Sequence, residues 1–173
     1  MNQTLSQEFP RVLLSAEQIK KRVQELARRI AADFQGKTVY IVAVMENSFI
    51  FMADLVRELD LPVVCQFVQG ESKSNSDTME IFYSPEIDVQ GQDVLLVEAL
   101  IQSGITSEFL IRNLMGRGAK SVKLAVLLDK QTSRRVSLQP DYFGFLVNDS
   151  FVVGYGLGAP HLGRNLPYIA AKS

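Results

Sequence analysis

The stretch VLLVEALIQSGITSEFLIRNL, residues 94–114, decides the fold because it contains three kinds of segment in a row. An apolar strand comes first, a short turn with Gly104 follows, and an amphipathic helix ends the stretch. The N–H groups that begin such a helix are unpaired and favour an anion, and Ser103 and Thr106 add hydroxyl groups there. The stretch therefore predicts a phosphate-binding turn, although an ordinary capped turn has the same pattern.

The composition indicates a globular protein of ordinary size. The chain has 173 residues, of which 47% are hydrophobic and 21% charged, and this predicts one domain with a full core. A net charge of −1 favours neither nucleic acid nor a membrane as a partner. No segment resembles a membrane span or a signal peptide. The one cysteine, Cys65, is expected to be a buried thiol in a reducing compartment, the cytoplasm.

Strands and helices alternate along the chain. Ser15 and Gln18 form a capping-box pattern before a helix whose apolar residues recur every three or four positions up to Phe34. Further helices are expected at 48–59 and 105–118. Strands are expected at 38–44, 62–69, 78–84, 93–99, 121–129, 141–147, 150–157 and 166–171. This order predicts an α/β fold with a central, mainly parallel β-sheet flanked by helices.

Ligands of parallel sheets bind at the carboxyl ends of the strands, and three loops qualify. They are MENS (45–48), EALIQSGIT (98–106) and DKQTSRR (129–135). In the third loop Lys130 can donate to a carbonyl or a phosphate, but a solvated basic turn has the same composition. Phe151 can stack on a planar ligand, with plain core packing as the alternative.

Two other segments are less informative. GESKSNSDT, residues 70–78, is polar and rich in serine, so it forms either a solvated hairpin tip or a functional lid. His161, the only histidine, is expected at the surface. The sequence has no pattern typical of a catalytic triad or a zinc site.

Several segments together resemble one family, the purine phosphoribosyltransferases, and within it the hypoxanthine/guanine phosphoribosyltransferases. The matching segments keep the family's order from about residue 15 to residue 170. They are SFIFMADLVREL, VLLVEALIQSGIT, LLDKQTSRR, PDYFGFLVNDSFVVGYGLG and RNLPYI. The resemblance implies a phosphoribosyltransferase type I fold in a single domain, residues 1–173, with a small hood formed roughly by residues 1–14 and 140–173.

The resemblance also implies a reaction and a set of site residues. Family members use Mg²⁺ to convert 5-phosphoribosyl pyrophosphate (PRPP) and a purine base into a nucleotide and pyrophosphate. The expected 5′-phosphate-binding residues are Ser103, Gly104, Ile105 and Thr106. The expected purine-binding residues are Lys130, which meets the six-position oxygen, Phe151, which stacks, and Val152, which offers its backbone.

The remaining site positions depart from the family pattern. Glu98 matches an acid near the ribose and the metal, so it is a candidate catalytic and metal-binding residue, but the acid expected beside it is Ala99. Gln102 stands at the general-base position, where an amide cannot act as a carboxylate base. The family has a metal-binding aspartate at the position of Gly158.

The groups for pyrophosphate are also altered. Glu46 and Asn47 occupy a pyrophosphate-binding loop that is usually basic, and the carboxylate of Glu46 would repel pyrophosphate. Arg164 matches an arginine near the pyrophosphate. The loop at residues 71–73 lacks the tyrosine that usually closes over the site.

These departures predict a protein that binds a purine nucleoside 5′-monophosphate, IMP or GMP, with weak or lost transferase activity. One alternative is an active Mg²⁺-dependent salvage enzyme that uses PRPP. Another is a regulatory, partner-binding module on the same fold. The apolar helix at 48–59 suggests a subunit interface, although a helix that packs only on its own sheet has the same pattern. Family members usually form homodimers or homotetramers.

Overall fold

A six-stranded sheet forms the centre of the computed structural model, which describes residues 11–72, 79–83, 88–148, 151–158 and 163–171. Its strand order is β4-β3-β2-β5-β6-β7. The strands are β2 (Val39–Met45), β3 (Val63–Ser72), β4 (Met79–Tyr83), β5 (Asp93–Ile101), β6 (Ser121–Asp129) and β7 (Tyr142–Leu146). Five strands are parallel, and β4 pairs antiparallel with β3 at one edge. The predicted α/β fold with a mainly parallel sheet is confirmed.

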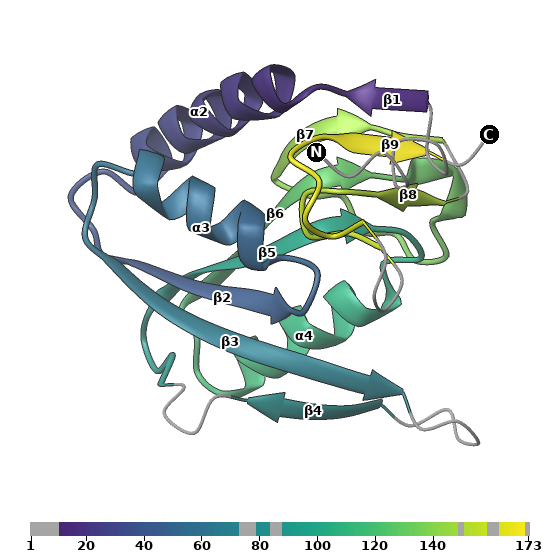
Figure 1. The fold of residues 1–173 in the computed structure, drawn as a ribbon. Helices are drawn as coiled ribbons and strands as arrows, with labels where there is room; N and C mark the ends of the chain where they lie inside the picture. The colour runs from purple at the N-terminus through teal and green to yellow at the C-terminus, as the bar shows by residue number, and fades with distance from the viewer. Residues whose placement is uncertain (1–10, 73–78, 84–87, 149–150, 159–162, 172–173) are drawn as a thin grey trace.

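Helices cover both faces of this sheet (Figure 1). The helices α2 (Ala16–Asp33) and α3 (Phe49–Glu58) pack on one face, and α4 (Ile105–Gly116) packs on the other. The central strands are buried on both faces, which explains their near-continuous apolar sequence. The strands β2, β5 and β6 run in the same direction, because each connection returns the chain to the edge at which the previous strand began. Their carboxyl ends therefore lie along the same edge of the sheet.

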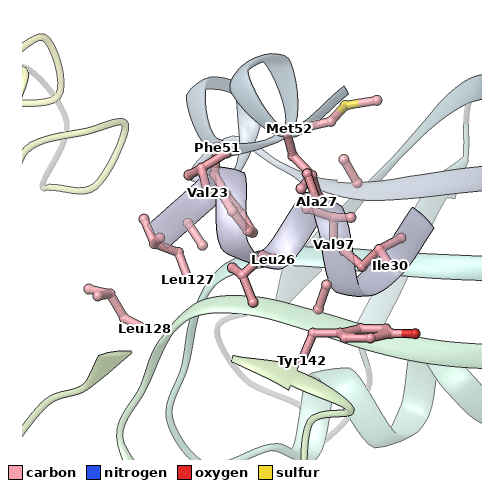
Figure 2. Close-up of a cluster of buried hydrophobic side chains, with 14 of the residues drawn as sticks. Val23, Leu26, Ala27, Ile30, Phe51, Met52, Val97, Leu127, Leu128 and Tyr142 are labelled. Carbon is pink, nitrogen blue, oxygen red and sulfur yellow. The ribbon is translucent and has the colours of Figure 1, made fainter. Parts of the chain in front are cut away.

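The larger core cluster lies between α2, α3 and the sheet. The predicted apolar face of α2 is buried, and it begins at the predicted capping box, in which Ser15 and Gln18 bond to each other's backbone N–H groups. In Figure 2, Leu26 and Ile30 of α2 lie in one cluster with Phe51 of α3 and Val97 of the sheet. This packing fixes α3, and therefore the 45–48 loop that precedes it.

A second sheet of three strands lies over the carboxyl end of β5 (Figure 1). It consists of β1 (Arg11–Leu14), β9 (Ile169–Ala171) and β8 (Val152–Val153), in that order and all antiparallel. The sequence prediction placed residues 140–173 in a hood, and this range begins too early. β7 belongs to the central sheet, because it pairs parallel with β6 from Tyr142 to Leu146.

Two further predictions can be compared with the structure. Cys65 is exposed, not buried as predicted. It lies on β3, whereas α3 covers the neighbouring strands β2 and β5. His161 and residues 73–78 of the predicted 70–78 loop lie outside the described residues. No helix among the described residues is long and apolar enough to cross a membrane.

Candidate active site

Two adjoining cavities lie where the loops after β2, β5 and β6 meet. One has a volume of about 130 Å³ and the other about 200 Å³, and both are lined by Asn47, Leu100 and Gln102. The first also touches Lys130, Phe151 and Val152, and the second also touches Ser103, Gly104 and Thr106. Apart from Ile105, the predicted purine-binding and phosphate-binding residues therefore line these two neighbouring cavities, which are together called the groove.

The phosphate end of the groove is the turn between β5 and α4. Gly104 is the N-cap of α4 and has a φ of 79°, a conformation that favours glycine. The backbone N–H of Ile105 lies 3.4 Å from Ser103 Oγ, and the Thr106 and Ser107 side chains lie in the first turn. The N–H groups of the first turn and the positive end of the helix dipole favour an anion here. Ile105 itself does not line either cavity.

The opposite end of the groove is more apolar. Phe151 is 44% exposed and Val152 is buried beside it at the start of β8. Lys130 follows β6 and lines the same cavity, whose walls also include Val147, Leu157 and Gly158. An exposed aromatic ring, a lysine and apolar walls suit a planar base that carries a polar oxygen.

Among the described residues that line the two cavities, Glu98 is the one carboxylate, and it is almost fully buried. It lies on β5 and is 7% exposed, and burial raises its pKa to about 7, against the opposing effects of a hydrogen bond with Ser107 and the charge of Arg134. Its Oε1 atom has no hydrogen-bond partner within the described part of the chain. Near neutral pH a large fraction of Glu98 is therefore protonated.

The positions beside Glu98 hold no second carboxylate. Ala99 is buried, and its backbone N–H donates to Ser48 Oγ at 2.9 Å, which joins the 45–48 loop to β5. Gln102 is exposed and lines both cavities, so its amide can donate to and accept from a ligand. This geometry suits binding better than proton abstraction.

Glu46, the neighbour of Asn47 in the chain, forms an ion pair with Arg164. A carboxylate oxygen of Glu46 lies 3.3 Å from Arg164 Nη2. The pair joins the 45–48 loop, whose Met45–Glu46 peptide bond is cis, to the segment after β8. The backbone carbonyl of Arg164 also accepts from the Gly156 N–H at 2.9 Å. The positive charge of Arg164 is therefore already paired with a carboxylate.

Mg²⁺, which the family resemblance implies, fits the described residues poorly. This ion prefers one or two ionised carboxylates together with ligand phosphates. Glu98 is buried with a raised pKa, while Ala99, Gln102 and Gly158 offer no carboxylate. The described residues contain no cluster of three metal-ligating side chains of the His, Cys, Asp or Glu type.

The sequence prediction missed several residues of the groove. Leu100, Val147 and Leu157 form its apolar walls, and Ser107 contacts Glu98 from the first turn of α4. Ser107 directly follows Thr106 in the sequence, so it could have been recognised as a second hydroxyl residue at the start of the helix. Arg134 was noted only as part of a basic turn, and its burial behind the phosphate turn depends on tertiary packing.

A larger cavity, of about 500 Å³, lies elsewhere, between α2, α3 and the segment around Tyr155 and Leu166. The ionisable groups of its wall are largely paired with one another. Asp54 bonds to both Arg57 and Tyr155, and Glu58 accepts from Gln24. The smaller groove at the carboxyl edge holds the convergent polar groups and is the better candidate site.

Comparisons with known proteins give matches along nearly the whole chain. The model of the phosphoribosyl transferase domain family matches residues 12–159. A hypoxanthine-guanine phosphoribosyltransferase of Bacillus subtilis is 36% identical over 169 residues, which cover 95% of this chain and 94% of that protein. A crystal structure of a hypoxanthine-guanine phosphoribosyltransferase from Bacillus anthracis has a TM-score of 0.90 and 36% identity, and the match covers 96% of this chain and 99% of that one.

A third relative is a longer protein. The bifunctional protein TilS/HprT of Listeria innocua is 37% identical over 172 residues, which cover 97% of this chain. The chain spans 26% of the length of that relative.

Proposed function

Because the chain belongs to the hypoxanthine-guanine phosphoribosyltransferase family, we propose that it binds a purine nucleoside 5′-monophosphate, IMP or GMP, and that its transferase activity is weak or lost. The observation that carries the proposal is the groove, two cavities that share the wall residues Asn47, Leu100 and Gln102. One end has the phosphate turn, the other has the base-binding residues, and Asn47 and Gln102 line both. A ribose between the two ends would join them.

The chain's own residues account for binding in this proposal. The N–H groups at the start of α4, with Ser103 and Thr106, hold the 5′-phosphate. Phe151 stacks on the purine, Lys130 donates to its six-position oxygen, and the backbone of Val152 contacts its edge. Gln102 lies within the same cavity and hydrogen-bonds the base.

Weak transfer is proposed because the groups for proton transfer and metal binding are changed. Gln102 cannot remove a proton, Ala99 cannot bind a metal ion, and Glu98 is only partly ionised at neutral pH. The ion pair between Glu46 and Arg164 also places a negative charge where pyrophosphate is expected. The described residues of the groove do not offer the ionised carboxylates that Mg²⁺ prefers, so this ion has no part in the proposed binding.

A second candidate is an active, Mg²⁺-dependent phosphoribosyltransferase that uses PRPP. The relatives favour this candidate over the loss of activity, since they are named as hypoxanthine-guanine phosphoribosyltransferases and match nearly the whole chain. Both candidates share the nucleotide-binding groove. They differ in turnover, which a direct assay decides.

We also infer a homodimer or homotetramer. Met45, Phe49 and Phe67 are all exposed, and they lie on the same side of the sheet around the start of α3. Covering such a surface with a second copy would bury apolar area. Light scattering on the purified protein tests this assembly. The predicted absence of nucleic-acid and membrane partners and the cytoplasmic location stay predictions.

Nucleotide binding is tested by calorimetric titration with IMP and GMP, with AMP as the control. AMP has an amino group in place of the six-position oxygen, so it loses the bond from Lys130. Micromolar binding of IMP or GMP, at least about tenfold tighter than AMP, is expected. Equal affinity for all three, or no binding, would overturn the proposed base recognition.

A further inference from the structure

Arg134 lies behind the phosphate turn as a nearly buried cation. Its side chain is 11% exposed, and its Nη2 group pairs with the carboxylate of Asp129, whose side chain is 0% exposed. Asp129 is the last residue of β6, and Arg134 follows it in the loop at the same edge of the sheet. The two charges therefore form an oriented pair within the wall of the site.

The guanidinium end of this pair contacts the phosphate turn. A Cβ atom added to Gly104 would lie 3.0 Å from Arg134 Cδ and 3.1 Å from Arg134 Nη1. The backbone N–H of the next residue, Arg135, donates to the Ser103 carbonyl at 2.9 Å. The positive end of the Asp129–Arg134 pair thus packs directly against the backbone that begins α4.

Two polar atoms of Arg134 are left over after this pairing. Nε and Nη1 are buried and have no hydrogen-bond partner within the described part of the chain. Unpaired buried N–H groups cost free energy, so a fold that only needed to neutralise Asp129 would gain from pairing them. Their positive charge is available to an anion on the other side of the turn, because charges in a protein interior are weakly screened.

We propose that Arg134 is a positioning residue for the 5′-phosphate, which it attracts through the thin wall formed by Gly104. This proposal rests on the proposed nucleotide-binding function, and it adds a charged group behind the turn to the residues that line it. The competing explanation is structural, with Arg134 serving only to neutralise Asp129 and to favour the ionised form of the buried Glu98. If Arg134 attracts the phosphate, removing its charge weakens the binding of IMP but not that of inosine. If Arg134 is only structural, both ligands are affected equally.

The test compares IMP with inosine, which lacks the phosphate, on a set of variants. Arg134→Met removes the charge but leaves Asp129 buried and unpaired, which can unfold the protein. The double variant Asp129→Asn with Arg134→Met removes both charges together. Arg134→Lys keeps the charge, and Arg135→Ala removes the same charge from an exposed neighbouring side chain. Circular dichroism checks the fold of each variant.

The expected result is a loss of IMP affinity of at least about tenfold in the double variant, which is a change of about 1.4 kcal/mol. Inosine affinity, followed by NMR titration, should change less than twofold. Arg134→Lys should stay within about threefold of wild-type protein for IMP, and Arg135→Ala should equal it.

Two results would overturn the inference about Arg134 while leaving nucleotide binding itself intact. The first is unchanged IMP affinity in a folded double variant, or an equal loss for IMP and inosine. The second is failure of the double variant to fold, which would assign Arg134 a structural role. Absence of IMP binding in wild-type protein would instead overturn the proposed function.

Discussion

The carboxylate of Glu46 lies 3.3 Å from the guanidinium of Arg164, and the pair ties the 45–48 loop to the segment that follows β8. Glu46 is 66% exposed and Arg164 is 26% exposed, so water and salt screen the pair. Its effect on the fold is therefore small. Its effect on ligands is larger, because a diphosphate that approaches Arg164 must also approach Glu46.

Glu46→Gln should tighten the binding of PRPP and pyrophosphate by about three- to tenfold at low salt, because it removes one negative charge beside Arg164. IMP affinity should stay unchanged. Calorimetric titration at two salt concentrations checks both statements. Asp60→Asn is a matched control, since it removes one negative charge from an exposed site after α3. Equal effects of the two substitutions would contradict a local role for Glu46.

Gln102→Asp should raise the transfer rate about 100-fold, because it places a carboxylate where only an amide lines the cavity. The reaction of hypoxanthine with PRPP, measured under steady-state conditions, provides the rate. Gln102→Asn is the control, since asparagine has the same shape as aspartate without the charge. If the aspartate and asparagine variants have the same rate, position 102 does not limit transfer.

Gly104→Ala should weaken IMP binding by at least about tenfold and destabilise the protein by about 1–3 kcal/mol. Alanine is strained at a φ of 79°, and its methyl group would lie 2.9 Å from Val136 Cγ2. Gly36→Ala separates these two causes. Gly36 has a φ of 73° but nothing within 4 Å of an added Cβ atom.

Chemical denaturation of the two variants, each followed by an IMP titration, makes the comparison. Gly36→Ala should lose about 1 kcal/mol from backbone strain alone and should bind IMP normally. Equal IMP affinity in both variants would contradict a close approach of ligand to the Gly104 turn.

The buried Glu98 should make stability fall as pH rises from about 4.5 to about 7. Its pKa is raised to about 7 in the folded protein, so folding takes up a proton in this range. Below the range both states are protonated, and the cost is absent. Above it the buried carboxylate is ionised, which costs about 3 kcal/mol from a shift of this size.

Glu98→Gln should therefore be more stable than wild-type protein at pH 8 by up to about 3 kcal/mol and about equal to it at pH 4. Urea denaturation at the two pH values measures this difference. A stability difference that is the same at pH 4 and pH 8 would show that Glu98 titrates normally.

Local patterns in the sequence were sufficient to predict most of the fold. The apolar positions of α2 and the capping box at Ser15 follow from helical spacing, and the central strands follow from their β-branched, apolar runs. The position of β7 was harder to predict, because an edge strand of the central sheet and a strand of the hood have similar sequences. Pairing with β6 decides it, and pairing is a tertiary property.

The site was predictable where it depends on a continuous segment and unpredictable where it depends on packing. Ser103, Gly104 and Thr106 are adjacent in the chain, so their shared turn could be recognised. The ion pair of Glu46 joins residues far apart in sequence. The contact between Arg134 and Gly104 also spans two loops, and no local pattern encodes it.

IMP binding and transferase turnover, measured together on a single preparation, decide between binding without transfer and an active enzyme. We expect micromolar IMP binding, together with turnover of hypoxanthine or guanine far below about 1 s⁻¹ in the presence of PRPP and Mg²⁺. Turnover of about 1 s⁻¹ or more, an ordinary value for an enzyme, would contradict weakened transfer and establish an active phosphoribosyltransferase with Gln102 and Ala99 in its site.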